Sequence, residues 1–350
     1  MSNYLTEHSN KSEYNFPGKN VQCFFDIDIK RLHEIFNKEN TIIITDENLF
    51  KLYSELLDGF FVIKIEAGEK VKQGETISNI IDVILDFNLG KSGWVVGLGG
   101  GVVTDIAGFV AATYKRGCNL ALVPTSLLAM VDASLGGKNG VDVGIYKNMV
   151  GTIYQPSYIL FDYNFLITLP FDEWTNGFAE IIKHACIADS QMFSFLEAND
   201  IFQIQKDKSI VAGLVERNVH IKMGIALQDE FDKNDRQLLN FGHTLGHAIE
   251  NLYNLPHGHA ISIGMVAACA LSERFLSFPF EESARVARLL AKFELPVDLD
   301  ADYNNIFEII KKDKKREGNE ISFVFLTSIG TGVTHKISLE SLRENLENIV

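Results

Sequence analysis

Apolar residues in the first half of the chain alternate between short continuous runs and stretches with helical spacing. We expect residues 1–20, which show few signals, to be partly loose. The runs at 41–45, 61–66, 94–97, 120–123 and 158–162 predict short buried strands, and the spacing in 77–88 and 106–116 predicts helices. Strands that alternate with helices indicate a largely parallel sheet with helices on its faces.

After about Pro170 the pattern becomes mainly helical. Helical spacing recurs in 173–188, 208–229, 236–252, 258–277, 281–293 and 303–312, and the run 321–326 is the only strand-like exception. We find no internal repeat and no low-complexity segment. The change predicts an α/β nucleotide-binding-type domain at 1–168 and a mainly α-helical domain at 169–350. The cleft between two domains is the default place for a site.

Composition and charge exclude several classes of protein. The net charge of −14 argues against non-specific binding to nucleic acid or to an anionic membrane. No apolar run approaches 18 residues, so we expect no membrane span. Residues 1–19 are polar and lack an apolar stretch, so we expect no secretory signal. Cys23, Cys118, Cys186 and Cys269 lack CxxC spacing, which is typical of reduced thiols in a cytoplasmic protein. Because the net charge is negative, an anionic ligand must bind at a local cluster of Lys and Arg.

Four of the nine histidines lie between His243 and His259. His243 and His247 are four apart in a helical run, so they share one helix face and can reach one metal ion. His257 or His259, just after a turn, could supply a third ligand. Isolated histidines are usually surface or core residues, but this clustering favours a metal site.

A glycine-rich turn at 97–105 (GLGGGVVTD) leads into a helix that we expect to begin near Val103. Glycines let the backbone approach a phosphate, and the first N–H groups of a helix point toward such an anion. The spacing is not GxGxxG, so a plain tight turn remains the alternative. Asp46, at the end of an earlier strand, could bond ribose hydroxyls.

Two further segments carry candidate charged groups. Residues 124–156 hold Asp132, Lys138, Lys147 and Asn148 in what we expect to be loops. The alternative to a functional role is that these lysines are ordinary solvated surface residues.

In 177–185, Glu180 and Lys183 are three apart, and an ordinary surface ion pair is the alternative to a functional role. A carboxylate in an otherwise apolar helix nevertheless needs a cation, and His184 is a rival ligand on the same helix. Lys222 and Arg236 are the remaining candidates for an anion clamp.

In their order along nearly the whole chain, the motifs resemble the 3-dehydroquinate synthase family of the sugar-phosphate cyclases. They are 45–48 (TDEN), 99–105 (GGGVVTD), 124–128 (PTSLL), 131–138 (VDASLGGK), 177–183 (GFAEIIK), 239–250 (LNFGHTLGHAIE), 257–259 (HGH) and 313–315 (DKK). Several motifs in one order make the resemblance specific.

The resemblance implies a Rossmann-like N-terminal domain and conversion of 3-deoxy-D-arabino-heptulosonate 7-phosphate into 3-dehydroquinate and phosphate. This reaction belongs to the shikimate pathway of aromatic amino-acid biosynthesis. It implies catalytic NAD, which is regenerated in each turnover, and a Zn²⁺ ion, with Co²⁺ as the alternative, acting as a Lewis acid. It also implies a cytoplasmic homodimer that acts on a small anionic sugar phosphate.

The same resemblance implies roles for individual residues. Glu180, His243 and His257 hold the metal, whereas His247 handles substrate and protons. NAD is bound by Asp46, Asn48, Glu69, Lys72, Gly101, Val102, Val103, Thr104, Asp105, Thr125, Ser126, Lys138, Lys147, Leu166 and Thr168. The substrate is contacted by Asp132, Lys138, Asn148, Lys183, Lys222, Arg236, Asn240 and His247, with Arg116 reaching into the neighbouring subunit and Lys314 or Lys315 completing the phosphate pocket.

Within that set, Lys138, Lys222 and Arg236 are expected to pair with the substrate carboxylate. Lys183, Asn148, His247 and Arg116 suit the phosphate. Two positions depart from the family pattern: Thr104 stands where glycine is usual, and His259 stands where glutamate is common. We expect Thr104 to keep a negative φ or to be strained, and His259 to alter the surroundings of the metal if it bonds a ligand.

Three alternatives remain. Related sugar-phosphate cyclases act on substrates without a carboxylate and have no use for three clamping cations. A polyol NAD-dependent dehydrogenase would release NADH stoichiometrically. A nucleotide-binding scaffold without activity should have lost some of these residues, and none of the expected ones is lost.

Overall fold

The computed structural model describes residues 5, 10–144, 146–300, 302–311 and 316–346. The chain divides into two compact units. The first comprises Met1–Pro170 with Val211–Phe231, and the second comprises Phe171–Ile210 with Asp232–Val350. Most of helix α9 (Lys208–Gln228) therefore belongs to the first unit, although it follows the first helices of the second unit in sequence.

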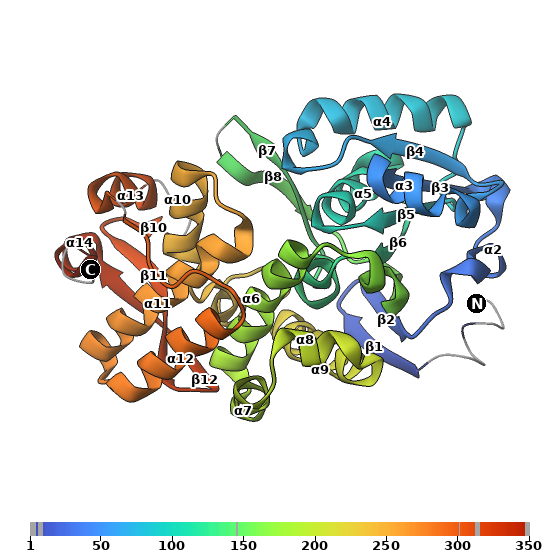
Figure 1. Cartoon of the computed structure of the whole chain (residues 1–350). Coiled ribbons are helices and arrows are strands. Elements are labelled where there is room, and N and C mark those ends of the chain that lie inside the picture. Colours follow the sequence, from blue (N-terminus) through green and yellow to red (C-terminus); the bar gives the residue numbers. More distant parts are fainter. Residues whose placement is uncertain (1–4, 6–9, 145, 301, 312–315, 347–350) are drawn as a thin grey trace. The chain divides into compact units, whose positions relative to one another are not determined.

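The first unit is built on a seven-stranded sheet with the strand order β1-β2-β9-β6-β5-β3-β4 (Figure 1). β1 pairs antiparallel with β2, and the other pairings in this sheet are parallel. The strands are β1 (Asn10–Phe16), β2 (Lys19–Phe25), β3 (Thr41–Asp46), β4 (Phe61–Ile65), β5 (Trp94–Gly99), β6 (Asn119–Pro124) and β9 (Tyr158–Leu160). The largely parallel sheet predicted from the sequence is confirmed.

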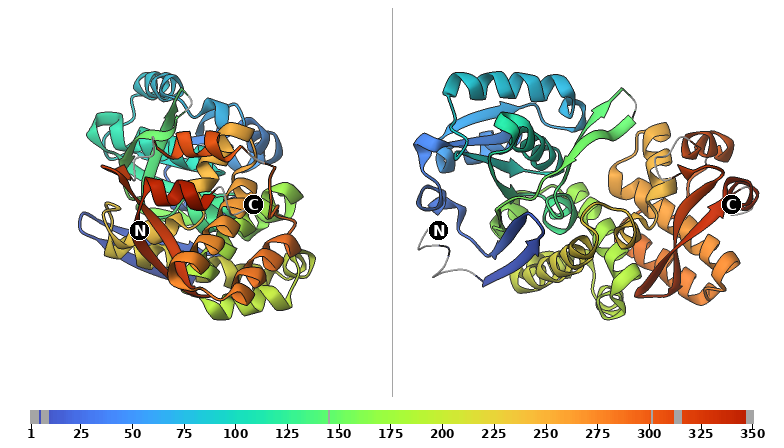
Figure 2. Two further views of the ribbon diagram at one scale, coloured as in Figure 1. Left: turned by 90° about the vertical axis from the view of Figure 1, so that its left-hand side faces the viewer. Right: turned by 180° about the vertical axis from the view of Figure 1, so that it is seen from behind.

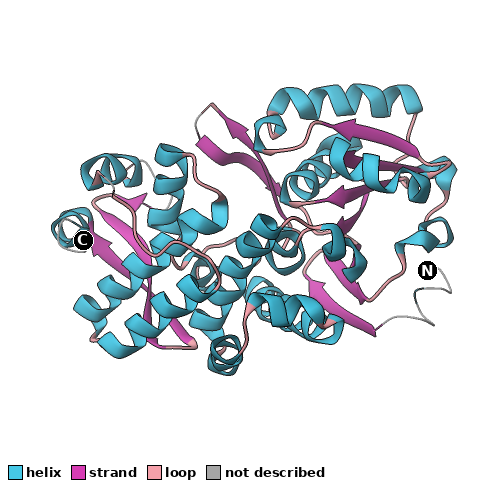
Figure 3. Ribbon diagram, in the orientation of Figure 1, coloured by secondary structure: helices cyan, strands magenta, loops and turns pink. Residues whose placement is uncertain are grey.

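Both faces of this sheet are covered, as Figure 3 shows with its cyan helices around magenta strands. Ile42 and Ile44 of β3 pack in one apolar cluster with α4 (Gly74–Phe87) and α5 (Gly101–Thr113). Ile43, between them, packs in a second cluster with Phe36 and Leu57. Successive strand residues point to opposite faces, so a strand buried on both sides reads as a continuous apolar run.

Shorter elements complete the first unit. Among the elements that the structure describes there are also the α-helices α2 (Leu32–Ile35) and α3 (Glu47–Tyr53) and the 3-10 helices η1 (Ile29–Arg31), η2 (Lys38–Asn40), η3 (Ser54–Leu57), η4 (Glu69–Val71), η5 (Tyr114–Arg116) and η7 (Tyr163–Thr168). A short π-helix, η6 (Ala129–Ala133), follows β6.

The loops predicted for 124–156 are wrong for most of that segment. Besides η6, it contains the antiparallel hairpin β7 (Lys138–Val143) and β8 (Tyr146–Ile153), which stands apart from the seven-stranded sheet (Figure 2). A Cβ added to Gly151 would lie 2.4 Å from the carbonyl oxygen of Asn139. Gly151 therefore allows the two strands to approach closely. In the sequence, the same glycine looks like a loop residue.

The N-terminal prediction is also wrong for residues 10–16, which form the edge strand β1. Only Tyr14 and Phe16 of this strand are buried. An edge strand with one pairing partner needs few apolar residues, so it leaves little trace in the hydrophobic pattern.

The second unit is mainly helical. Its helices are α6 (Phe171–Ala188), α7 (Ser190–Ala198), α8 (Ile201–Lys206), η8 (Asp235–Asn240), α10 (His243–Tyr253), α11 (His257–Leu276), α12 (Phe280–Lys292), α13 (Tyr303–Ile310) and α14 (Leu339–Leu346). It also contains a small antiparallel sheet of β10 (Arg316–Glu317), β11 (Glu320–Ser328) and β12 (Thr331–Ser338). The run at 321–326 is therefore not the only strand, because β12, in which only Ile337 is buried, pairs with it.

Two predicted helices have different limits. The helix predicted at 236–252 is divided into η8 and α10 by Gly242, whose φ of +76° starts α10 from a left-handed residue. The helix predicted at 106–116 is α5, which begins at Gly101 and ends at Thr113. Lys115 and Arg116 both have positive φ, so the helix cannot continue through them.

Helix α11 is, by length and composition, the one described helix that could cross a membrane. Of its apolar window, 61% is buried inside the protein. This burial is the pattern of a core helix in a soluble protein, because a lipid-facing helix would leave its apolar side chains outward.

Candidate functional site

Three helices of the second unit each contribute one side chain to a group of potential metal ligands. Glu180 lies in the middle of α6, whereas His243 and His257 are the first residues of α10 and α11. Nε2 of His257 lies 3.3 Å, and Nε2 of His243 3.5 Å, from Oε1 of Glu180. The three ligand atoms lie within 4.8 Å of one another, so a single cation can contact all of them.

Glycines allow these helices to approach closely enough for the group to form. A Cβ on Gly264 of α11 would lie 2.1 Å from the carbonyl oxygen of Gly242, directly before α10. At the start of α11, a Cβ on Gly258 would lie 2.8 Å from Cα of Asn176 in α6, and Oδ1 of Asn176 accepts the Gly258 N–H at 2.6 Å. The three helix segments therefore meet backbone to backbone, with one ligand on each.

Glu180 is a buried carboxylate surrounded by positive or potentially positive groups. It has no exposed surface, and its Oε2 pairs with Nζ of the equally buried Lys183. The alternative of an ordinary surface ion pair is therefore wrong. Burial alone lowers the pKa of His257, but hydrogen bonds with Glu180 and Glu250 outweigh it and raise this pKa to about 10. The pocket thus favours a positive charge.

The donor set fits a divalent metal. Two imidazoles and one carboxylate are the ligands that zinc takes in catalytic sites, where three protein ligands leave one position open. Nδ1 of His243 lies 3.1 Å from the carbonyl oxygen of Phe241. A carbonyl only accepts, so Nδ1 carries the hydrogen and the lone pair of Nε2 is available on the side of Glu180.

The other histidines lie outside this group. His247 is one turn further along α10, its ring centroid 5.1 Å from that of His243, but its ligand atoms group with Glu250 and His257 instead of Glu180. His184 is fully buried in α6 and does not join the group of Glu180, His243 and His257. His259 is half-buried, and burial lowers its pKa; among the described residues it belongs to no ligand group.

Glu250 is the candidate that sequence reasoning missed. It is 7% exposed, and its Oε2 lies 3.4 Å from Nδ1 of His257. The available signal was its position seven residues after His243, on the same face of one helix.

Two other polar residues of the second unit lie just before α10, in η8. Arg236 is only 2% exposed and is among the largest fully buried side chains of the described chain. Asn240 is half-buried. A buried guanidinium is stable only where acceptors or anions meet it, so the surroundings of Arg236 suit an anion.

The nucleotide-binding candidates of the first unit begin where β5 ends and α5 starts. The glycine-rich turn is shorter than predicted, because Gly99 ends the strand and Gly101 starts the helix. The N-cap residue is Gly100, which has no side chain that could accept from the first N–H groups of the helix. A Cβ on Gly99 would lie 2.5 Å from Cβ of Val103, so α5 starts directly against the strand. Such a helix start suits an anion.

Thr104 fits this helix without strain. Its N–H donates to the carbonyl of Gly100 at 3.0 Å and its hydroxyl donates to that of Gly101 at 2.9 Å. It does not appear among the residues with positive φ. The expected negative φ is therefore confirmed, and threonine replaces the usual glycine as an ordinary residue of the first helical turn, beside Val102 and Val103.

A buried ion pair lies next to this turn. Nζ of Lys72 lies 2.5 Å from Oδ2 of Asp105 and 3.7 Å from Oε1 of the exposed Glu69. Burial lowers the pKa of Lys72, but Asp105 and Glu69 outweigh it and raise the pKa above its usual value. Burial raises the pKa of Asp105. The pair links the residue that follows η4 to the second turn of α5.

Asp46 has a structural role as a helix cap. It is the N-cap of α3, and its Oδ1 accepts the N–H groups of Asn48 at 2.9 Å and Leu49 at 3.0 Å. Only Oδ2 remains outside this cap. Asn48 itself is exposed.

The remaining candidates on this side follow β6 or lie within η7. The Thr125 N–H donates to the carbonyl of Gly99 at 3.0 Å, and Oγ of Ser126 accepts the Ala129 N–H at 3.2 Å. Thr168 lies 2.6 Å from the hydroxyl of Tyr53, whereas Leu166 is buried.

The hairpin carries Lys138 at the start of β7 and Lys147 and Asn148 on β8. Asn148 has a φ of +53°, and its N–H donates to Oδ1 of Asp142 at 2.7 Å. The Asp142 N–H in turn donates to the carbonyl of Lys72 at 2.7 Å. These bonds attach the hairpin to the segment of the Lys72–Asp105 pair.

Asp132 lies on η6, and Lys222 of α9 reaches it within the first unit. A single π-helical turn is uncommon and is frequent at functional sites. Arg116, in contrast, is exposed in η5 with a φ of +59°. It lies beyond Thr113, where α5 ends, and not inside the helix predicted at 106–116. Lys314 and Lys315 lie outside the described residues.

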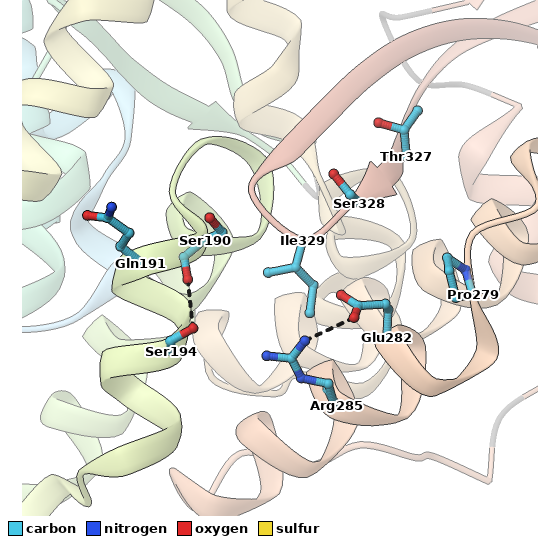
Figure 4. Close-up of a pocket in the computed structure, with 9 residues that line it drawn as sticks. All are labelled: Ser190, Gln191, Ser194, Pro279, Glu282, Arg285, Thr327, Ser328 and Ile329. Carbon is cyan, nitrogen blue, oxygen red and sulfur yellow. Dashed lines mark hydrogen bonds and ion pairs between the residues drawn. The ribbon is translucent and has the colours of Figure 1, made fainter.

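A separate cavity of about 560 Å³ opens in the second unit (Figure 4). None of its lining residues belongs to the metal group. Its guanidinium, Arg285, is held by Glu197 at 2.6 Å and by Glu282 at 2.9 Å, so its charge is balanced.

Two family models match the chain. One is described as 3-dehydroquinate synthase N-terminal and covers residues 62–176; the other is described as 3-dehydroquinate synthase C-terminal and covers 177–316. The chain is 39% identical over 321 residues to the 3-dehydroquinate synthase of Pyrococcus abyssi, across 89% of this chain and 92% of that relative. It is 36% identical over 323 residues to that of Sulfolobus acidocaldarius, across 89% of this chain and 91% of that relative.

The fold is also that of a solved structure, the 2-epi-5-epi-valiolone synthase of Streptomyces hygroscopicus with NAD⁺ and Zn²⁺ bound. The TM-score is 0.85 at 25% identity, over 97% of this chain and 98% of that chain. The family and the fold class expected from the motifs are thereby confirmed. Two matching models and relatives of this similarity over most of its length show that the chain belongs to the 3-dehydroquinate synthase family.

Proposed function

We propose that this chain converts 3-deoxy-D-arabino-heptulosonate 7-phosphate into 3-dehydroquinate and phosphate. The observation that carries the proposal is the group of Glu180, His243 and His257, which offers three metal ligands in a member of this family. When bound, NAD takes up and returns a hydride at one substrate carbon, and a divalent metal, Zn²⁺ or Co²⁺, polarises the oxygen on it.

Residues 1–168 bind the nucleotide, and residues 169–350 hold the metal, with Val211–Phe231 packed in the first unit. The uncapped start of α5 binds the pyrophosphate through its N–H groups. Because Oδ1 of Asp46 caps α3, Oδ2 is the atom that accepts a ribose hydroxyl. The further nucleotide contacts come from Asn48, Glu69, Lys72, Gly101, Val102, Val103, Thr104, Asp105, Thr125, Ser126, Lys138, Lys147, Leu166 and Thr168.

The substrate carboxylate is bound by Lys138, Lys222 and Arg236. Arg236 suits a bidentate pair because its planar guanidinium matches carboxylate geometry. Its burial supports this role, since a desolvated guanidinium gains most from an anionic partner. Asp132 orients Lys222, and Asn240 adds a neutral contact beside Arg236.

The phosphate is bound by Lys183, Asn148, His247 and Arg116. His247 moves a proton at the substrate from its place one turn beyond His243, and the leaving phosphate itself serves as the base for its elimination. Arg116 acts on the neighbouring subunit of a homodimer. Its exposure and left-handed backbone support that role, because the side chain is held outside helix α5.

We place the protein in the cytoplasm. The described chain contains four free cysteines, all buried, which suits a reducing compartment.

The test is turnover with bound NAD. We expect one phosphate for each heptulosonate phosphate consumed and no net change in NADH absorbance. Net NADH in proportion to turnover would identify a polyol dehydrogenase. Turnover of sugar phosphates without a carboxylate, at rates equal to or above that of the heptulosonate phosphate, would instead identify a related cyclase.

A further inference from the structure

Glu250 contacts His257, one of the three potential metal ligands Glu180, His243 and His257. It stands on α10, three residues after His247 and seven after His243, and is 7% exposed. Residues with this spacing share one helix face. From that face, Oε2 of Glu250 lies 3.4 Å from Nδ1 of His257 at the start of α11.

This contact determines which nitrogen of His257 is left for a cation. An ionised carboxylate only accepts hydrogen bonds, so Nδ1 carries the hydrogen when it bonds Glu250. Nε2 lies 3.3 Å from Oε1 of Glu180, so it is the nitrogen that gives its lone pair to a cation bound there in place of a proton. Glu250 therefore holds the ring in the tautomer that a metal at Glu180 requires.

His257 depends on such a partner more than His243 does. The His243 side chain is 10% exposed and a backbone carbonyl fixes its Nδ1. The His257 side chain is 27% exposed, so water competes for the ring. A charged acceptor makes a stronger hydrogen bond than a neutral carbonyl and offsets that competition.

Glu250 could instead be a metal ligand itself. Ligand atoms of His247, Glu250 and His257 also lie within 4.8 Å of one another. A neutral imidazole has one lone pair, so His257 cannot bind one metal through Nε2 and another through Nδ1 without losing its last proton. The group of Glu180 is the better centre, because its fully buried carboxylate has the greater need of a cation.

We propose that Glu250 is a positioning residue that orients His257 and strengthens the bond of its Nε2 to a metal held by Glu180, His243 and His257. The inference rests on the proposed metal role of those three residues. Glu250 itself is not a ligand in this arrangement.

Zinc affinity of the full-length apoprotein, measured by competition with a chromophoric chelator, tests the proposal. We expect Glu250→Ala to weaken zinc binding roughly 10–100-fold with the stoichiometry unchanged, as for other partners of metal-bound histidines. Glu250→Gln should lose less, because its amide oxygen still accepts from Nδ1. Glu282→Gln removes a carboxylate of α12 and is the matched control; it should bind zinc like the wild type.

The visible absorption of bound Co²⁺ separates orientation of the ligand from a general effect on folding. We expect Glu250→Ala to shift the Co²⁺ bands, whereas a change that only loosens the fold leaves them in place. Wild-type affinity in Glu250→Ala overturns the proposal. Loss as complete as in Glu180→Ala also overturns it, since Glu250 would then be a ligand. If Glu180→Ala and His243→Ala both bind zinc like the wild type, the metal site itself is wrong, which is a separate result.

Discussion

Lys222 contacts Asp132 at two points. Its Nζ lies 2.6 Å from the backbone oxygen of Asp132 and 2.8 Å from Oδ2, although the residues are 90 positions apart in the sequence. Lys222 is 7% exposed, so the pair is largely shielded from water. The contact joins α9 to the π-helical turn η6 and is one of the contacts that Val211–Phe231 makes within the first unit.

Breaking this pair should destabilise the protein. We expect Lys222→Met to lower the free energy of unfolding by roughly 3 kcal/mol, since it leaves a partly buried carboxylate without its cation. Asp132→Asn should cost less, because the backbone oxygen still accepts from Lys222. Urea unfolding measures both, with the exposed Lys70→Met as control. Equal midpoints for Lys222→Met and Lys70→Met would contradict the prediction.

Metal binding should distinguish the two histidines of α10. We expect His243→Ala to lose tight zinc binding and His247→Ala to keep it, because only His243 presents Nε2 to Glu180. Equilibrium dialysis followed by metal analysis measures the zinc retained. Losses of the same size in both variants would show that His247 is a ligand.

Arg236 should discriminate between ligands by their charge. Removing one partner of a desolvated charge pair costs roughly 2–5 kcal/mol. Arg236→Ala should therefore weaken binding of a carboxylate-bearing substrate analogue far more than binding of its neutral-headed counterpart. Calorimetry with the two analogues gives the difference, and the same loss for both would remove the argument against a related cyclase.

Arg116 should act across a subunit interface. Arg116→Ala and Lys183→Ala should each be nearly inactive alone. In a mixed dimer, one site then carries both defects and the other carries neither, so each heterodimer should regain about half the activity of a wild-type dimer. Subunit exchange is verified with distinguishable tags. Without recovery after verified exchange, Arg116 serves its own subunit.

The four thiols should be unreactive in the folded protein. Burial raises the pKa of each, that of Cys118 to about 11. Because the thiolate is the reactive form and the pKa lies above the assay range, labelling by a disulfide reagent should be slow at pH 8 and should accelerate about tenfold per pH unit toward 11. All four should react in urea. Rapid labelling at pH 8 without denaturant would contradict this burial.

Much of the first unit is determined by local sequence. The runs that become β3 and β5 are apolar without interruption because both faces of the sheet are covered, and a property of consecutive residues is visible in the sequence. The edge strand β1 and the strand β12, which both have few buried residues, are different. Their stability comes from pairing with a neighbouring strand, so their own residues show little of it.

The motifs also determined the family and, through it, the prediction that Glu180, His243 and His257 hold a metal. Spacing alone favoured His247 as a metal ligand as much as His243. Residues four apart share a helix face, and this spacing does not show which of them faces Glu180. Only the tertiary structure decides which histidine meets Glu180. The carbonyl of Gly242 lies against Gly264, and this contact brings the start of α10 to α11. The partnership of Glu250 with His257 arises from the same packing, since a hydrogen bond between two helices depends on their distance and orientation, which no periodicity within one helix encodes.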